Sequence, residues 1–143
     1  MIPEINYWAV LLATVSSMLV GTIWYAPKVF GTRWSTLSGA SMEGTGKDAV
    51  VPIAVTVVVS FVTAWVLAGA TTIAWHFYEG SYFVSAVVTG LLLWAGFTAA
   101  RFITHDAFEG RPSGLTTLNI AHELVTIVVM AVIVGVWPPA GTV

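Results

Sequence analysis

Long stretches without charge alternate with short polar segments along this chain. Residues 5–27, 49–78 and 80–100 contain no Asp, Glu, Lys or Arg, and residues 115–137 contain one such residue, Glu123. A helix needs ~20 mostly apolar residues to cross the hydrocarbon core of a bilayer. The pattern therefore predicts four transmembrane helices, near residues 5–26, 51–75, 81–104 and 114–137.

A valine-rich run in the second stretch, residues 55–59, would favour a strand in water. Here it lies within a charge-free stretch far longer than a strand, and lipid favours helices because their backbone hydrogen bonds are satisfied internally. We therefore expect an all-α fold: an integral membrane four-helix bundle of two hairpins. Residues 1–143 form a single transmembrane domain in this interpretation.

Composition agrees with a membrane setting. The mean hydropathy is +0.89, and 8% of the residues are charged, whereas soluble proteins contain about 25%. The chain has no cysteine, which excludes disulfides and thiol catalysis. A net charge of −2 does not indicate a nucleic-acid partner. Residues 1–4 lack a basic segment, so we expect the first helix to be retained rather than cleaved as a signal peptide.

The basic residues lie in or beside the loops that follow the first and third helices. Lys and Arg favour the cytoplasmic side, so we expect both termini outside and loops 28–49 and 105–113 in the cytoplasm. Residues 28–37 mix basic and apolar side chains, which is typical of a segment lying at the interface. Residues 38–46, rich in Ser, Gly and Thr, are expected to be flexible. The five basic residues are Lys28, Arg33, Lys47, Arg101 and Arg111.

Polar residues inside the predicted helices supply a candidate site. Glu123 lies ~15 Å along its helix, near the bilayer centre, where a charge costs at least ~2.5–3.5 kcal/mol. Asn119 is one turn away, His122 is adjacent, and Arg101 on the third helix is expected to reach toward them. Three interpretations stay open: a polar network that fixes helix register, a site for an ion, a proton or a small ligand, and subunit contacts.

Small residues four positions apart indicate close helix packing, within one chain or between subunits. The pairs are Ser17/Gly21, Ala64/Ala68, Gly96/Ala100 and Ala131/Gly135. Trp65 and Trp94, in the middle of their helices, are expected to be packing residues.

Patterns typical of hydrolases, kinases and metalloproteases are absent from the sequence. His122-Glu123 lacks the second histidine of a zinc helix, because position 126 is Thr126. We therefore predict no metal, no cofactor and no catalytic residue, and we assign no enzyme activity.

Two motifs carry a resemblance to a known family. The first ends the first helix and contains Trp24, Tyr25, Pro27, Gly31 and Trp34; the second contains Glu109, Gly110, Arg111 and Pro112. Together with the opening at residues 5–7, they resemble a bacterial membrane protein family known as domain of unknown function 1761. The family usually has Ser at position 26 and a bulky residue at position 113. The resemblance implies a four-helix protein of the inner membrane and supplies no activity.

The motifs also have a physical interpretation. Pro27 is expected to end or kink the first helix, and Gly31 permits a tight turn. Residues 109–112 are expected to form the short turn before the fourth helix. We expect a homo-oligomeric membrane module that contacts the bilayer and binds a lipid, a small ligand or a partner protein. The alternative is a transporter or channel for protons, ions or small solutes, built around Arg101, Asn119 and Glu123.

Overall fold

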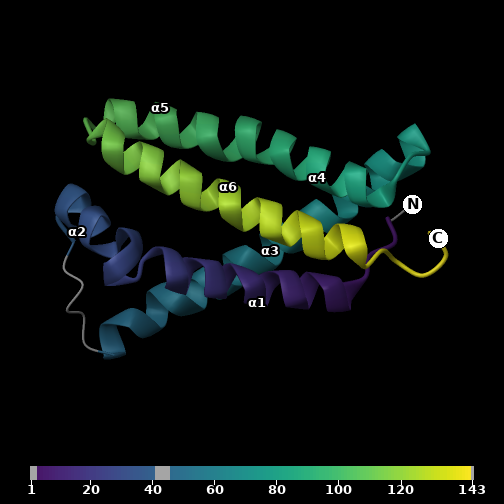
Figure 1. Ribbon diagram of the computed structural model, residues 1–143, viewed down its shortest axis with the longest axis horizontal. Helices are drawn as coiled ribbons and strands as arrows, with labels where there is room; N and C mark the ends of the chain where they lie inside the picture. The colour runs from purple at the N-terminus through teal and green to yellow at the C-terminus, as the bar shows by residue number, and fades with distance from the viewer. Residues whose placement is uncertain (1–2, 41–45, 143) are drawn as a thin grey trace.

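The computed structural model describes residues 3–40 and 46–142, and this part of the chain contains helices and no strand (Figure 1). The order is α1 (Tyr7–Trp24), the π-helical turn η1 (Pro27–Gly31), α2 (Thr32–Ser38), α3 (Gly46–Tyr78), α4 (Tyr82–Leu93), the π-helical segment η2 (Trp94–Ala99), α5 (Ala100–Phe108) and α6 (Ser113–Val136).

Four helices are long and apolar enough to cross a membrane, as the charge pattern predicts: α1, α3, the continuous rod α4–η2–α5, and α6. The first and fourth end within a few residues of their predicted bounds. The second begins at Gly46 rather than near residue 51, and the third continues to Phe108 rather than ending near residue 104. The loop predicted at residues 105–113 is therefore only a short turn before α6.

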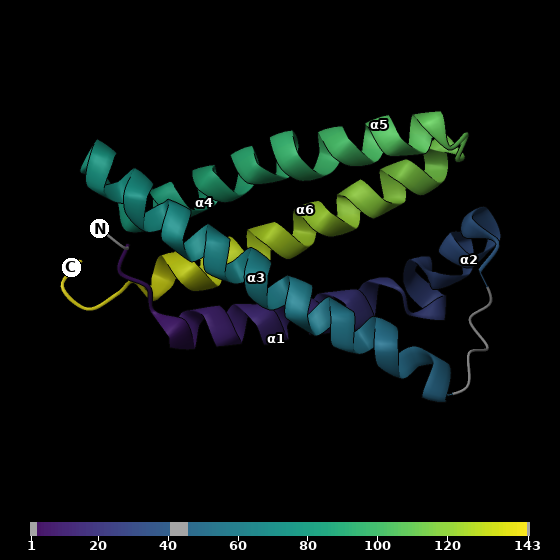
Figure 2. The ribbon, with the colours of Figure 1, turned by 180° about the vertical axis from the view of Figure 1, so that it is seen from behind.

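The four long helices pack in the cyclic order α1, α3, α4, α6 (Figures 1 and 2). The buried core lies between α1, α3, α4 and α6, and its largest side chains include Val10, Leu67, Met130 and Val134. By their positions along α1, α3 and α6, these residues belong to the half of the bundle that carries both termini. Figure 2 shows the two termini together at that end. In the other half, α5 packs against α6 and makes no contact with α3. The helices of this half therefore enclose a smaller part of the core.

Close approach of α4 and α6 depends on small residues. A Cβ atom added at Gly135 would lie 3.1 Å from the Phe83 Cα, and one added at Gly90 would lie 3.2 Å from the Ala131 Cβ. Ala131 and Gly135 are buried, as are Ala64 and Ala68, so the packing prediction is confirmed for both pairs. Gly96 and Ala100 are exposed, so this pair does not pack within the chain, and its packing between subunits stays a prediction.

Hydrogen bonds close the end of the bundle that carries the termini. The Asn6 side chain caps α1 by accepting from the Trp8 and Ala9 backbone N–H groups at 3.1 and 3.3 Å. Its amide also donates to the Trp137 carbonyl at 3.1 Å. One side chain thus joins the start of the first helix to the end of the last.

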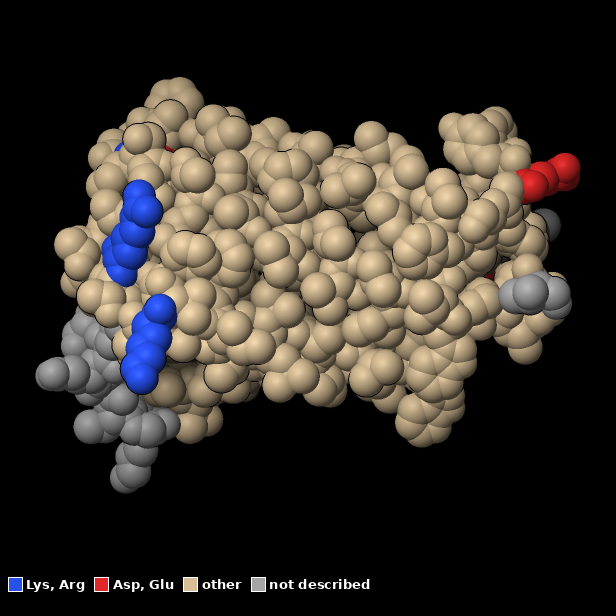
Figure 3. Space-filling model, in the orientation of Figure 1, with Lys and Arg blue, Asp and Glu red and all other residues tan. Residues whose placement is uncertain are grey.

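The opposite end, which we call the basic end, carries η1, α2 and the α5–α6 turn. Figure 3 shows Lys and Arg side chains gathered at this end of the visible face, with charge-free surface between them and the other end. At Gly39 the chain leaves α2 in a left-handed conformation, with φ 71°, which glycine adopts without strain. Most of the segment predicted to be flexible, residues 41–45, lies outside the described residues.

Candidate functional site

A groove of about 520 Å³ opens between α1, α3 and α6, toward the basic end of the bundle. We call it the acidic groove, because Glu123 is the charged residue in its lining. Hydroxyl groups from all three helices face it. The polar and small lining residues are Ser17, Gly21, Thr22, Tyr25, Thr56, Ser60, Thr63, His122, Glu123 and Thr126.

Two neighbouring residues of α6 form the polar centre of the groove. The His122 Nδ1 lies 3.3 Å from the Glu123 Oε1. The His122 side chain is 13% exposed and that of Glu123 is 39% exposed. The carboxylate is therefore reachable from the groove, while the imidazole behind it is largely enclosed by protein.

The first family motif builds the wall around that imidazole. The rings of Trp24 and Tyr25 lie 5.9 and 5.0 Å from the ring of His122, centroid to centroid. Trp24 in turn packs against Phe30 at 4.5 Å, and Tyr25 packs edge-on against Trp34 at 5.5 Å. The η1 turn brings these aromatic residues together, since the Gly31 N–H donates to the Ala26 carbonyl five residues earlier, at 3.0 Å.

The imidazole also faces the backbone of α1 at Gly21. A Cβ atom at this position would lie 3.7 Å from the His122 Nε2, which is an ordinary van der Waals contact. Sequence reasoning assigned mainly structural roles to the motif and did not connect it with His122. A pattern of residue types along one helix does not show which side chain of another helix it surrounds.

Tyr25 sits just beyond the end of α1, at the edge of the groove. Burial, and to a lesser extent the negative charge of Glu123, raises the pKa of Tyr25 to about 12 from 10.0. Its phenol is neutral at physiological pH, as that of an ordinary tyrosine is, and can donate a hydrogen bond.

The hydroxyl groups of the groove present mainly their lone pairs. Ser17, Thr22 and Thr63 each donate to a carbonyl of their own helix, at 2.8, 2.8 and 2.9 Å, which leaves their oxygens free to accept. Two buried polar atoms, the His122 Nε2 and the Thr126 Oγ1, have no hydrogen-bond partner among the described residues. Buried polar groups without partners are uncommon in native proteins and call for an explanation.

Arg101 does not join this site, contrary to expectation. It faces the other side of α6, into a second groove of about 460 Å³ between α5 and α6, which Asn119 also lines. The four predicted site residues are thus divided into two pairs: His122 and Glu123 in the acidic groove, and Arg101 and Asn119 in the other. Arg101 and Glu123 form no ion pair in the part of the chain that the structure describes.

The second family motif closes the α5–α6 turn. The Arg111 Nε donates to the Glu109 Oε2 at 2.6 Å and lies 3.8 Å from the Asp106 Oδ1. Asp106 also accepts from the Thr116 hydroxyl at 2.7 Å. Glu109, then Asp106, raises the pKa of the exposed Arg111 guanidinium. Sequence reasoning missed Asp106, because it placed residue 106 in a loop rather than in the last turns of a helix.

Among the side chains that the structure describes, no three His, Asp or Glu residues lie close enough together to hold a metal ion. Comparison with known proteins gives a family but no activity. The model of the family described as protein of unknown function (DUF1761) matches residues 8–135. Neither the curated proteins nor the solved structures contain a match to this chain.

Proposed function

This chain belongs to the DUF1761 family, and we propose that it is a membrane module that binds a small amphiphilic ligand in the acidic groove. The ligand is one that carries a positive charge or several hydrogen-bond donors. The observation that carries the proposal is the groove itself: a carboxylate and a row of hydroxyl oxygens lie within the part of the bundle that is apolar enough to cross a membrane.

The membrane setting follows from the distribution of apolar and basic residues. Large apolar side chains are exposed along the long helices, particularly between Val50 and Val59 on α3. Such a surface is stable in lipid and would aggregate in water. We place the basic end in the cytoplasm and both termini outside the cell membrane, because Lys28, Arg33 and Arg111 all lie at the basic end.

The chemistry of the lining favours a donor ligand. Glu123 accepts only, when ionised, and the hydroxyls of Ser17, Thr22 and Thr63 already donate within their helices. An ammonium group would form an ion pair with the Glu123 carboxylate and donate hydrogen bonds to the hydroxyl oxygens. An apolar tail attached to it would lie between the helices, in contact with lipid. The same contacts would offset the cost of keeping a carboxylate far from water.

One observation favours a second candidate function, proton transfer. Glu123 touches the Nδ1 of His122, whose Nε2 is buried and has no partner in the described part of the chain. A carboxylate and an imidazole in contact can pass a proton between them. Proton flux into liposomes, followed with an internal pH dye, would then fall in both Glu123→Gln and His122→Gln.

A binding measurement tests the main proposal. Purified protein in neutral detergent is titrated with dodecylammonium and with dodecanol, which has the same tail and no charge. We expect dodecylammonium to bind more tightly, and Glu123→Gln to weaken it by about tenfold, or ~1.4 kcal/mol. Glu79→Gln, which removes an exposed carboxylate of the α3–α4 turn that lines neither groove, is the matched control and should bind normally. Equal binding of both ligands, or no effect of Glu123→Gln, would refute the proposal.

A further inference from the structure

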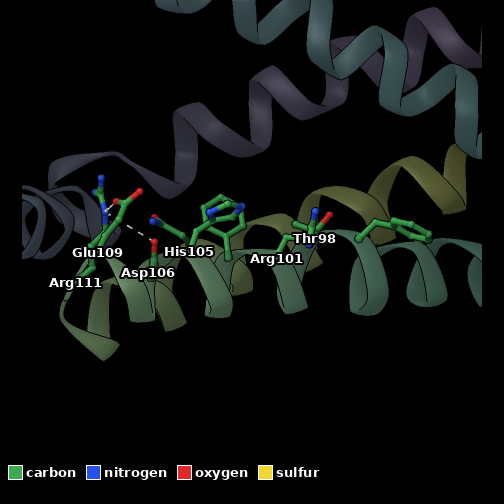
Figure 4. A pocket seen from close by; sticks show the side chains of 9 residues that line it. Thr98, Arg101, His105, Asp106, Glu109 and Arg111 are labelled. Carbon is green, nitrogen blue, oxygen red and sulfur yellow. Dashed lines mark hydrogen bonds and ion pairs between the residues drawn. The ribbon is translucent and has the colours of Figure 1, made fainter.

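The second groove, between α5 and α6, differs in chemistry from the acidic groove. Figure 4 shows its polar side chains in a row along η2 and α5, with Thr98 and Arg101 at one end of the row and Asp106, Glu109 and Arg111 together at the turn. We propose that this groove binds the head group of a phospholipid that carries both a phosphate and a primary ammonium, as phosphatidylethanolamine does. The proposal does not depend on the function of the acidic groove.

Arg101 supplies the phosphate-binding end. Its side chain is exposed in the groove, and neither it nor the His105 side chain makes a hydrogen bond or ion pair with the residues that the structure describes. The two residues are four positions apart and so lie on the same side of α5. Asn119 faces them from α6, at the same groove. Guanidinium, imidazole and amide groups are all donors that suit phosphate oxygens.

The depth of Arg101 matches the lipid phosphate. The third span contains 27 residues, or ~40 Å of helix, whereas the hydrocarbon core is ~30 Å thick. For a helix that is upright and centred in the bilayer, about 5 Å projects beyond the core at each end. Arg101 precedes the last helical residue, Phe108, by seven positions, or ~10 Å. In that placement its Cα lies ~5 Å inside the hydrocarbon, and its long side chain reaches the level of the phosphates.

The turn supplies the ammonium-binding end. Asp106 and Glu109 share one cation, Arg111, so this end of the groove keeps a net charge of −1. This end of the groove lies closer to water than Arg101 does. In a phospholipid the ammonium group likewise lies closer to water than the phosphate. The groove is positive at its inner end, negative at its outer end and neutral in sum, since it has two arginines and two carboxylates. That polarity favours a zwitterionic head over an anionic one.

Apolar side chains extend the groove toward the membrane interior. Phe97, which is 77% exposed, lies one turn beyond Arg101, and Phe102 lines the same groove. These rings offer a surface along which an acyl chain can lie. The η2 segment sets this arrangement: π-helical bulges alter the rotation of the residues that follow and are frequent at functional sites. The Trp94 indole fixes the bulge by donating to the Ile120 carbonyl at 2.9 Å.

Native mass spectrometry of the detergent-purified protein tests the proposal. Phosphatidylethanolamine, phosphatidylglycerol and phosphatidylcholine with identical acyl chains are compared as ligands. We expect phosphatidylethanolamine to bind most tightly. Arg101→Gln should weaken it by about tenfold and Arg101→Lys by less, because a lysine keeps the charge without the fork of donors. Arg33→Gln, which removes a basic residue of α2 at the same end, is the control and should bind normally.

A further variant tests the contact with the ammonium group. A soluble competitor tests whether the ligand is a membrane lipid or a free phosphate compound. Glu109→Gln should remove the preference for phosphatidylethanolamine over phosphatidylglycerol, since it weakens the ammonium end alone. Soluble phosphoethanolamine should fail to displace the lipid at millimolar concentration. The proposal is overturned if all three lipids bind alike, if phosphatidylglycerol binds best, if both Arg101 variants bind like the wild type, or if soluble phosphoethanolamine displaces the lipid.

Discussion

The ring of Tyr25 lies 5.0 Å from the ring of His122, centroid to centroid, so the end of the first helix covers the polar centre of the last. This contact joins the first family motif to the acidic groove. It also places Tyr25 where burial and the charge of Glu123 act on its phenol, and the ionisation of this tyrosine therefore reports on the site.

Tyr25 should ionise later than an ordinary tyrosine. Its pKa in the folded protein is about 12, above the unfolded value of about 10. The stability that the neutral phenol contributes is thus present below pH 10 and is lost as the pH rises through 12. The difference in ultraviolet absorbance between wild type and Tyr25→Phe, followed from pH 9 to 13, should have its midpoint near 12. A midpoint near 10 would show that Tyr25 is not buried beside Glu123.

Gly135 tests the close packing of α4 and α6. An added methyl group would meet the backbone of α4 at Phe83, which cannot yield as a flexible side chain can. We expect Gly135→Ala to destabilise the protein by ~1–3 kcal/mol through overpacking, measured as a lower midpoint of thermal unfolding in detergent. Gly96→Ala is the matched control, because its Cβ would meet nothing within 4 Å. Equal midpoints for the two variants would contradict the packing described for Gly135.

The charge pattern predicted the four long helices because a helix that is able to cross a membrane must be apolar over most of its length, and this property is visible in the sequence. It did not predict that the third helix continues through Asp106, because a charged residue after an apolar stretch is typical of a loop. The sequence alone does not show that Thr116 and Arg111 are the partners of this carboxylate. Nor did it predict η2, because a π-helical bulge comes from local backbone packing and leaves no hydrophobic period of its own.

The predicted proximity of Arg101 and Glu123 was wrong for a related reason. It rested on depth along the helix axes, which the sequence determines well. Contact also requires the two side chains to point the same way, and rotation about the helix axes decides that. Glu123 faces α1 and α3, whereas Arg101 faces the groove between α5 and α6. The expected homo-oligomer stays a prediction.

Asn6 is expected to stabilise the protein in two ways, which different substitutions separate. Asn6→Ser keeps a cap for α1 but cannot reach the Trp137 carbonyl, whereas Asn6→Ala removes both interactions. Loss of a helix cap costs ~1 kcal/mol, so Asn6→Ala should be less stable than Asn6→Ser by about that amount, and Asn6→Ser less stable than the wild type. Chemical unfolding in mixed micelles measures the series. Identical stability of Asn6→Ser and wild type would show that the bond to Trp137 contributes nothing.

The proposed orientation can be tested with single cysteines, since the chain has none of its own. Gly80 and Thr36 are both exposed, the first in the α3–α4 turn and the second on α2 at the basic end. A membrane-impermeant maleimide applied to intact cells should label Gly80→Cys and should label Thr36→Cys only after the cells are permeabilised. The reverse pattern would invert the topology.

The acidic groove is tested most directly by a hydrophobic carbodiimide, a reagent that reaches carboxyl groups in an apolar environment. The site of the adduct is identified by peptide mass spectrometry, with and without dodecylammonium, and dodecanol serves as the matched competitor. We predict that Glu123 is modified, that dodecylammonium protects it and that dodecanol does not. Modification elsewhere with Glu123 left untouched, or equal protection by both compounds, would contradict a donor-binding groove at this carboxylate.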